Sequence, residues 1–259
     1  MHSPSTNKII KVLFGIPNEG HTECQAYDNR LEMCFHLGNL QTLSHFGHRE
    51  YGGIKFDIPD GVEYQFSIAS VGQVLTPLAR EHLAEHARDE GFDYLFMVDD
   101  DMLTPLDLFE QLVKHDVDII APLAFSRSAP HKPVIYNLEK GWDNMRQEHF
   151  YVNHVVPNYP KDKLVKCDAV GFGAVLIKTK VLKSMAKPYF MSTTGAGEDI
   201  WFCHKAGENG FGVYMDTACK LGHLGYPKVI TEAVYEAESD VNELREERGD
   251  LDKYNKTTG

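Results

Sequence analysis

The sequence predicts an α/β fold in which a mostly parallel central sheet is flanked by helices. Apolar runs typical of strands alternate with amphipathic helical patterns from Lys8 to Phe125, which is the order expected of a doubly wound sheet. Several of the strand runs are short and continuously apolar, as expected of strands covered on both faces. After Phe125, strand-like runs follow one another without long helices between them. We therefore expect antiparallel additions to the sheet.

The elements of the first half are bounded by local start and stop signals. Thr76 and Thr104 are each followed by proline, and this pair suits an N-cap and the first helical position. Gly47 and Gly91 suit helix C-termini. The expected elements are strand 8–17, helix 22–47, strand 62–70, helix 76–91, strand 93–98, helix 104–115 and strand 118–125.

The second half is predicted to add strands and two further helices. Strand-like runs occupy 132–138, 163–170, 173–178 and 211–216, helical patterns occupy 178–185 and 198–210, and 219–225 reads as a loop. From Thr231 onward the sequence is strongly charged and nearly free of large aliphatic residues, which predicts a solvated helical extension or tail. We therefore divide the chain into a domain at 1–230 and an extension at 231–259.

Composition narrows the class of protein. The chain has 259 residues, 42% of them hydrophobic, and a formal net charge of −12, which disfavours binding to nucleic acid phosphates. Its five scattered cysteines lack CxxC spacing, so we expect reduced thiols and a cytoplasmic location, the host cytoplasm if a phage encodes the protein. Neither a signal peptide nor a run of about 20 apolar residues is evident, so no membrane span is expected.

Three consecutive aspartates, Asp99, Asp100 and Asp101, follow the apolar run 93–98. Carboxylates this close raise one another's pKa unless a cation or hydrogen-bond donors hold them. In open α/β sheets, ligands bind at the carboxyl ends of strands, and carboxylate oxygens suit Mg²⁺ or Mn²⁺. The alternative is a solvated acidic turn in which Asp101 or Thr104 caps the next helix.

Three further features could belong to the same site. Glu198 and Asp199 begin a predicted helix after a glycine-rich turn, where carboxylates either favour the helix dipole or present a base over a cavity. His223 stands between glycines just past a strand, although a lone histidine is more often a packed or surface side chain. Gly171 and Gly173 would let backbone approach a ligand closely.

These segments together resemble the GT-A fold glycosyltransferases, most closely the small bacterial and phage-encoded ones. The resemblance spans about 8–225, and the matching motifs occur in the family's order. They are DYLFMVDDDM (93–102), AVGFGAVLIK (169–178), GEDIWFCHKAGENGFGVYMD (197–216) and GHLG (222–225). The resemblance implies metal-dependent transfer of a sugar from a nucleotide-diphosphate sugar, with a UDP-sugar favoured, to an acceptor hydroxyl.

The resemblance also implies roles for individual residues. Asp101 and His223 would bind Mn²⁺ or Mg²⁺ bridging the donor diphosphate. Asp99 would approach the ribose or join the metal ligands. Asp199, beside Glu198, matches the catalytic base of inverting members, and in a retaining enzyme it would instead orient a substrate. The other residues implied at the donor are Pro17, Asn18 and Glu19 at the nucleobase, Gly171 and Phe172 at the sugar, Arg80 at the donor, and Asp100 as an alternative metal or ribose ligand.

Some choices stay open at the level of sequence. Arg80 could simply cover a helix surface with its aliphatic stem. The aromatic-rich stretch 125–160 suits either an acceptor-binding flap or a packed loop. The acceptor could be a glycan, a protein, a small molecule or a modified nucleobase, and a homo-oligomer is compatible with the sequence.

Other functions are compatible with a carboxylate site of this kind. A nucleotidyltransferase that makes sugar nucleotides typically has an arginine-rich phosphate loop after its first strand, and GIPNEGHTEC (15–24) contains no arginine. A metal-dependent hydrolase or nuclease would need a paired-metal site. A sugar-binding module would not need the Glu198–Asp199 pair.

Overall fold

The central feature of the fold is a seven-stranded mixed sheet. A computed structural model describes residues 7–18, 24–143, 148–193, 195–225 and 229–237. The strands, in spatial order, are β10 (Leu164–Cys167), β13 (Val213–Lys220), β7 (Ile119–Leu123), β12 (Ala174–Lys178), β5 (Tyr94–Val98), β1 (Lys8–Asn18) and β4 (Val62–Gly72). β12 and β10 run antiparallel to their neighbours, and the other five strands are parallel to one another. The expected mostly parallel sheet with antiparallel additions is confirmed.

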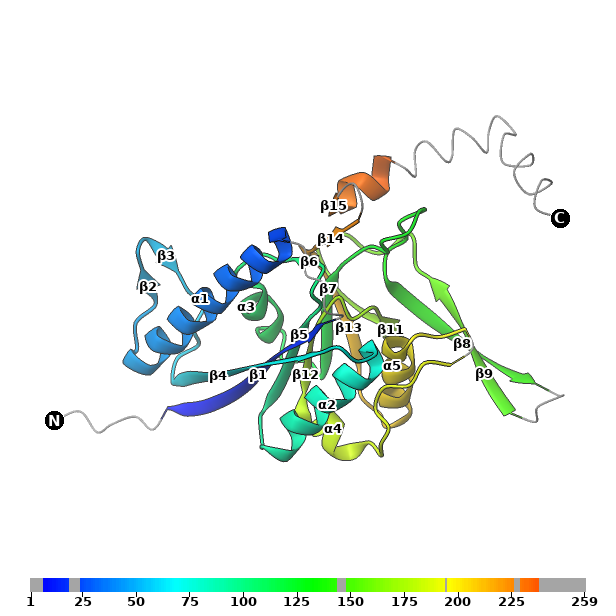
Figure 1. Ribbon diagram of the computed structural model, residues 1–259, viewed down its shortest axis with the longest axis horizontal. Helices are drawn as coiled ribbons and strands as arrows, with labels where there is room; N and C mark the ends of the chain where they lie inside the picture. The colour runs from blue at the N-terminus through cyan, green and yellow to red at the C-terminus, as the bar shows by residue number, and fades with distance from the viewer. Residues whose placement is uncertain (1–6, 19–23, 144–147, 194, 226–228, 238–259) are drawn as a thin grey trace.

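Helices cover both faces of this sheet (Figure 1). Helices α1 (Cys24–Phe46) and α3 (Leu108–Val113) pack on one face. Helices α2 (Thr76–Asp89), α4 (Thr179–Ser184) and α5 (Glu198–Glu208) pack on the other. The residues of β5 from Leu95 to Val98 are fully buried between the two layers, which explains why that run is continuously apolar.

Three small sheets complete the described chain. They are β11 (Ala169–Val170) with β8 (Ile135–Asp143) and β9 (Glu148–Val155), β15 (Val229–Ile230) with β14 (Gly222–Leu224) and β6 (Met102–Leu103), and β2 (Glu50–Tyr51) with β3 (Ile54–Lys55). The stretch 125–160 thus contains an antiparallel pair, β8 and β9, which extends away from the central sheet (Figure 1). The side chains of 142–151 lie outside the described residues.

Two local expectations were wrong. The predicted loop 219–225 is mostly extended, because β13 continues to Lys220 and β14 pairs with β6. Thr104 does not begin a helix: α3 starts at Leu108, and the backbone N–H and hydroxyl of Thr104 donate to Asn29 on α1. A side-chain partner on another helix has therefore replaced the cap that the Thr-Pro pair suggested.

The start of the charged C-terminal segment packs on the body of the protein. Residues 232–237 are helical, and the ring of Tyr235 stacks on Phe125 with 4.9 Å between centroids. The carboxylate of Glu232 accepts hydrogen bonds from Lys161 at 2.5 Å and Tyr159 at 2.7 Å, and it pairs with Lys220 at 2.5 Å. The expected solvated character therefore does not apply to this first turn. Residues 238–259 lie outside the described part of the chain.

No helix within the described residues is long and apolar enough to cross a membrane.

Replacing Glu232 by glutamine should destabilise the protein in a pH-dependent way. Burial raises the pKa of Glu232, but its bonds from Lys161, Lys220 and Tyr159 outweigh that effect and hold the pKa at about 2, below the ordinary 4.5. The carboxylate's stabilisation is therefore fully present above about pH 4.5 and is lost as the pH falls towards 2. Urea unfolding at neutral pH should show a loss of about 1–2 kcal/mol. A difference between the two proteins that does not shrink in acid would contradict this assignment.

Candidate functional site

The aspartate triplet lies where β5 leaves the sheet. The backbone N–H of Asp99 donates to the carbonyl of Gly173 at 2.8 Å, and that of Met102 donates to the carbonyl of Asp99 at 3.4 Å. A Cβ atom on Gly173 would lie 2.9 Å from the Met102 side chain. A larger residue at position 173 would therefore require the end of the Met102 side chain to shift, so packing beneath the triplet is one reason for glycine there.

Asp101 and His223 are brought together by a short strand pair. β14 pairs with β6 so that His223 stands opposite Met102, and the N–H of Leu224 donates to the carbonyl of Asp101 at 2.9 Å. This pairing places Nε2 of His223 3.0 Å from Oδ2 of Asp101. The two residues that were expected to share a metal, 122 positions apart in the chain, are therefore adjacent.

The imidazole of His223 is held from its other side. Nδ1 lies 2.8 Å from the carbonyl oxygen of Phe125, so Nδ1 carries the proton and donates, since a carbonyl can only accept. Nε2 therefore faces Asp101: the imidazolium donates from Nε2 to Oδ2 of Asp101, and the neutral ring would leave the Nε2 lone pair for a metal ion. Histidines that ligate metals commonly donate their second nitrogen to a carbonyl in this way.

Asp101 and His223 each favour the charged form of the other. Burial raises the pKa of Asp101, but the hydrogen bond from His223 and the charges of His223 and Arg127 outweigh it, so the pKa lies below its usual range. Burial lowers the pKa of His223, and Asp101 more than reverses that effect.

The donor atoms of this pair fit a divalent cation of the Mg²⁺ or Mn²⁺ kind. An octahedral ion with ligands at about 2.1 Å holds adjacent donor atoms about 3 Å apart, as Oδ2 and Nε2 already are. No group of three or more His, Cys, Asp or Glu side chains within the described ranges could hold an ion. Asp101 and His223 would therefore supply two ligands, and substrate oxygens and water would supply the rest, as is common for Mg²⁺.

Arg80 is buried near the Asp101–His223 pair and bonds to several segments of the chain. One of its terminal nitrogens lies 2.8 Å from both carboxylate oxygens of Asp99 and 3.1 Å from the carbonyl of Phe172. The other terminal nitrogen is hydrogen-bonded to the carboxylate of Glu198. The side chain of Arg80 is only 4% exposed. Arg80 therefore joins the triplet on β5 to the start of α5.

Two further arginines lie against the triplet, and no sequence motif marks either of them. Arg30 on α1 is buried and lies 3.4 Å from the carbonyl of Asp99. Burial lowers the pKa of Arg30, and the nearby carboxylates of Asp100 and Asp101 oppose that shift. Arg127, just past β7, lies 3.2 Å from Oδ2 of Asp101. Isolated arginines carry no motif, so only the fold reveals them.

The expected role of Asp99 as a metal ligand is not supported by its contacts, because both of its oxygens face Arg80. Burial raises the pKa of Asp99 to about 7, against the lowering effect of Arg80. Asp100 is also buried and lies near Arg30. Asp101 is thus the member of the triplet that points towards His223.

Asp199 lies at the first turn of α5. One of its oxygens accepts a hydrogen bond from the N–H of Ile200 at 2.7 Å. Burial raises the pKa of Asp199 and Glu198 adds to that shift, whereas Arg80 opposes it. The neighbouring Glu198 is committed to Arg80. Among the described side chains, no arginine is bonded to Asp199, whereas Glu198 is paired with Arg80.

The remaining expected donor residues are only partly placed at this site. Pro17 and Asn18 end β1 at the same edge of the sheet as the triplet, and Glu19 lies outside the described residues. The ring of Phe172 is 1% exposed and packs against Phe190 and Phe202. The guanidinium of Arg80 lies 5.8 Å from the centre of this ring and also contacts the carbonyl of Phe172. The buried ring is therefore packing, and a contact of Phe172 with a donor sugar stays a prediction.

Gly171 is explained by packing. A Cβ atom there would lie 2.8 Å from the side chain of Val134, and its N–H donates to the carbonyl of the same residue at 2.8 Å. This glycine therefore permits close packing against Val134, the residue just before β8.

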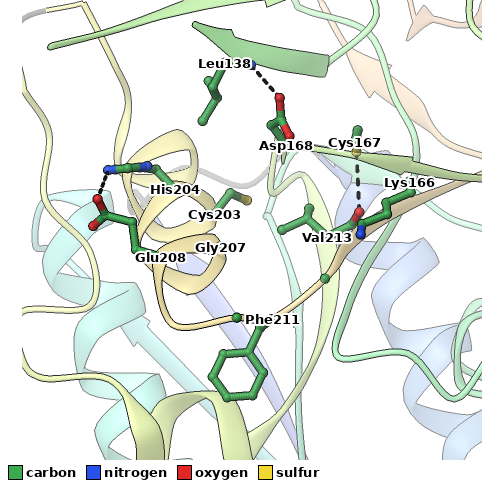
Figure 2. A pocket seen from close by; sticks show the side chains of 12 residues that line it. Leu138, Lys166, Cys167, Asp168, Cys203, His204, Gly207, Glu208, Phe211 and Val213 are labelled. Atoms are coloured by element: carbon green, nitrogen blue, oxygen red, sulfur yellow. Dashed lines mark hydrogen bonds and ion pairs between the residues drawn. The ribbon is translucent and has the colours of Figure 1, made fainter. Parts of the chain in front are cut away.

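A separate pocket of about 530 Å³ lies at the opposite edge of the sheet (Figure 2). Its lining includes Val213, where β13 begins, and Glu208, where α5 ends. Figure 2 shows Leu138 above this space and the end of α5 beside it. Since Asp199 stands at the beginning of α5, the pocket and the aspartate triplet are distinct.

Comparisons with known proteins are consistent with the fold. No protein-family model matches the chain, and no curated protein matches its sequence. The crystal structure of A197 from STIV is similar, with a TM-score of 0.50 and 17% identity, over 86% of this chain and 94% of that one. At such low identity the similarity is informative about the fold alone.

Two more distant likenesses involve proteins of named activity. A structure of GalNAc-T7 with UDP, GalNAc and Mn²⁺ has a TM-score of 0.42 and 11% identity, over 86% of this chain and 44% of that one. An apo UDP-glucose pyrophosphorylase has a TM-score of 0.43 and 11% identity, over 92% of this chain and all of the other. These scores are too low to support an argument about the reaction.

The buried position of Arg80 predicts a large cost on its removal. Arg80→Met would leave the partly buried carboxylates of Asp99 and Glu198 without a cation, which should lower the free energy of unfolding by about 3 kcal/mol. Arg127→Met removes an exposed arginine that pairs with Asp101 of the same triplet. It should lower the free energy of unfolding by less than about 1 kcal/mol. Urea unfolding of both variants tests this contrast. Equal losses of stability in the two variants would mean that the bonds of Arg80 to Asp99 and Glu198 do not stabilise the fold more than the exposed Arg127 does.

Proposed function

We propose that the protein is a divalent-metal-dependent glycosyltransferase that uses a nucleotide-diphosphate sugar, with a UDP-sugar as the favoured donor. The observation that carries this proposal is the Asp101–His223 pair, in which Nδ1 of His223 donates to Phe125 and the two metal-facing atoms are 3.0 Å apart. The pair stands at the carboxyl end of β5, the edge at which α/β sheets bind ligands.

The residues around this pair suit the transfer of a sugar. A bound divalent cation would act as a Lewis acid on the donor diphosphate and make it a better leaving group. Asp101 and His223 would hold that cation, and Pro17 and Asn18 at the end of β1 would approach the nucleobase. Arg80 keeps Asp99 and Glu198 in place rather than binding the donor itself, because its side chain is 4% exposed and its terminal nitrogens are bonded to Asp99, Glu198 and the carbonyl of Phe172.

Asp199 is the group best suited to take a proton from the acceptor hydroxyl. Burial raises its pKa, and a carboxylate with a raised pKa is a stronger base near neutral pH. Its neighbour Glu198 is neutralised by Arg80, so the two adjacent carboxylates differ in role. This assignment holds for transfer with inversion at the anomeric carbon.

The donor site is tested by binding of nucleoside diphosphates. UDP, GDP, CDP and TDP are titrated calorimetrically into the protein with Mn²⁺ or with EDTA. We expect one of them, UDP first, to bind with Mn²⁺ and to lose most of its affinity in EDTA. Asp101→Asn and His223→Ala should each abolish the dependence on Mn²⁺ while the far-ultraviolet circular dichroism stays unchanged. Failure of all four nucleotides to bind would rule out the proposed reaction.

The proposed base is tested by Asp199→Asn. This substitution should lower the rate of UDP release from a UDP-sugar, with water or a simple sugar as acceptor, by roughly 100-fold or more. Binding of UDP with Mn²⁺ should stay within about twofold of the wild type, since the variant keeps the metal pair. If turnover survives the substitution, Asp199 is not the base.

A further inference from the structure

The three arginines around the triplet differ in how firmly they are held. Arg80 is bonded to Asp99, Glu198 and the carbonyl of Phe172, and Arg30 is buried against the backbone of Asp99. The guanidinium of Arg80 cannot turn towards a ligand without leaving two partly buried carboxylates uncompensated, which is strongly destabilising. Arg30 is 7% exposed and is held by packing on α1. Both are therefore structural in this site.

Arg127 is the exception. Its side chain is 60% exposed, and its contact with the triplet is one nitrogen 3.2 Å from Oδ2 of Asp101. Exposed ion pairs of this kind contribute about 0–1 kcal/mol. The guanidinium can therefore leave Asp101 at little cost.

The oxygen that Arg127 contacts is also the one that faces His223. Oδ2 of Asp101 lies 3.0 Å from Nε2 of His223 and 3.2 Å from the nearest nitrogen of Arg127. Arg127 thus contacts the same carboxylate oxygen that a divalent cation would bind. Once a cation is bound there, the attraction between Arg127 and Asp101 is replaced by repulsion from the cation, and the guanidinium has to find another anion.

The loop that carries Arg127 keeps it at the rim of the site. The N–H of Ser126 donates to the carbonyl of Lys132 at 2.9 Å, and the N–H of His131 donates to that of Ser128 at 3.0 Å. The buried ring of His131 lies with Nδ1 3.0 Å from the carbonyl of Ser126. These bonds close the loop on itself, so a displaced Arg127 side chain stays next to Asp101 and its ligand.

We propose that Arg127 is the arginine that binds the diphosphate of the donor, exchanging its contact with Asp101 for the phosphate oxygens when metal and nucleotide bind together. This inference rests on the proposed function. Guanidinium groups match phosphate oxygens with paired donors, and of the three arginines only Arg127 is exposed. The role expected for Arg80 from the sequence therefore belongs to Arg127.

The test compares Arg127→Gln with Lys132→Gln. Lys132 is an exposed cation on the same loop that makes no ion pair with Asp101 in the described structure, so its substitution controls for the loss of net charge. Each variant is titrated calorimetrically with Mn²⁺ alone, and with UDP and uridine in the presence of Mn²⁺. If another nucleoside diphosphate binds the wild type more tightly, it and its nucleoside replace UDP and uridine.

Arg127→Gln should weaken UDP binding about 10- to 100-fold and leave uridine binding unchanged. Its affinity for Mn²⁺ alone should equal or exceed that of the wild type, because a competing cation has been removed from Asp101. Arg127→Lys should restore part of the UDP affinity, and Lys132→Gln should behave like the wild type.

Three results would overturn the inference. Unchanged UDP affinity in Arg127→Gln, or an equal loss in Lys132→Gln, would show that Arg127 does not bind the diphosphate while the donor site itself stands. A wild type that binds no nucleoside diphosphate would remove the proposed function and this inference together.

Discussion

The site depends on how positive charge is supplied to three adjacent carboxylates at the end of β5. Asp99 faces Arg80, Asp100 lies near Arg30, and Asp101 meets His223 and Arg127. Like charges this close are tolerable only when each has a partner. Two of the three arginines are buried and come from α1 and α2, so packing of those helices on the sheet is also what makes the triplet stable.

The arginines beside the aspartate triplet differ in burial, and we assign them different roles on that basis. Arg80 links β5 to α5 and fixes the position of Asp199 through its bond to Glu198. Arg127 touches one oxygen from an exposed position. Asp101 is thereby left as the carboxylate whose partners can be exchanged for a ligand. The β6–β14 pairing holds His223 opposite it, and Phe125 fixes the imidazole.

The sequence was sufficient to predict the sheet and most of the site's carboxylates, because buried strands such as β5 and helices such as α2 have periodic local signals. Through the family resemblance it also placed Asp101 with His223, but it assigned Arg80 to the donor and not to Asp99. It could not show Arg30 or Arg127, since a single arginine becomes part of a site only through long-range packing. The inward ring of Phe172, the strand at His223 and the docking of Tyr235 on Phe125 likewise depend on contacts between distant segments.

The most direct test of the metal assignment is anomalous diffraction at the manganese edge from crystals grown with Mn²⁺ and UDP. The account predicts one strong peak within bonding distance, about 2.0–2.3 Å, of Oδ2 of Asp101 and Nε2 of His223, with Arg80 still bonded to Asp99 and Glu198. A peak bound to Asp99, or one away from Asp101 and His223, would contradict it.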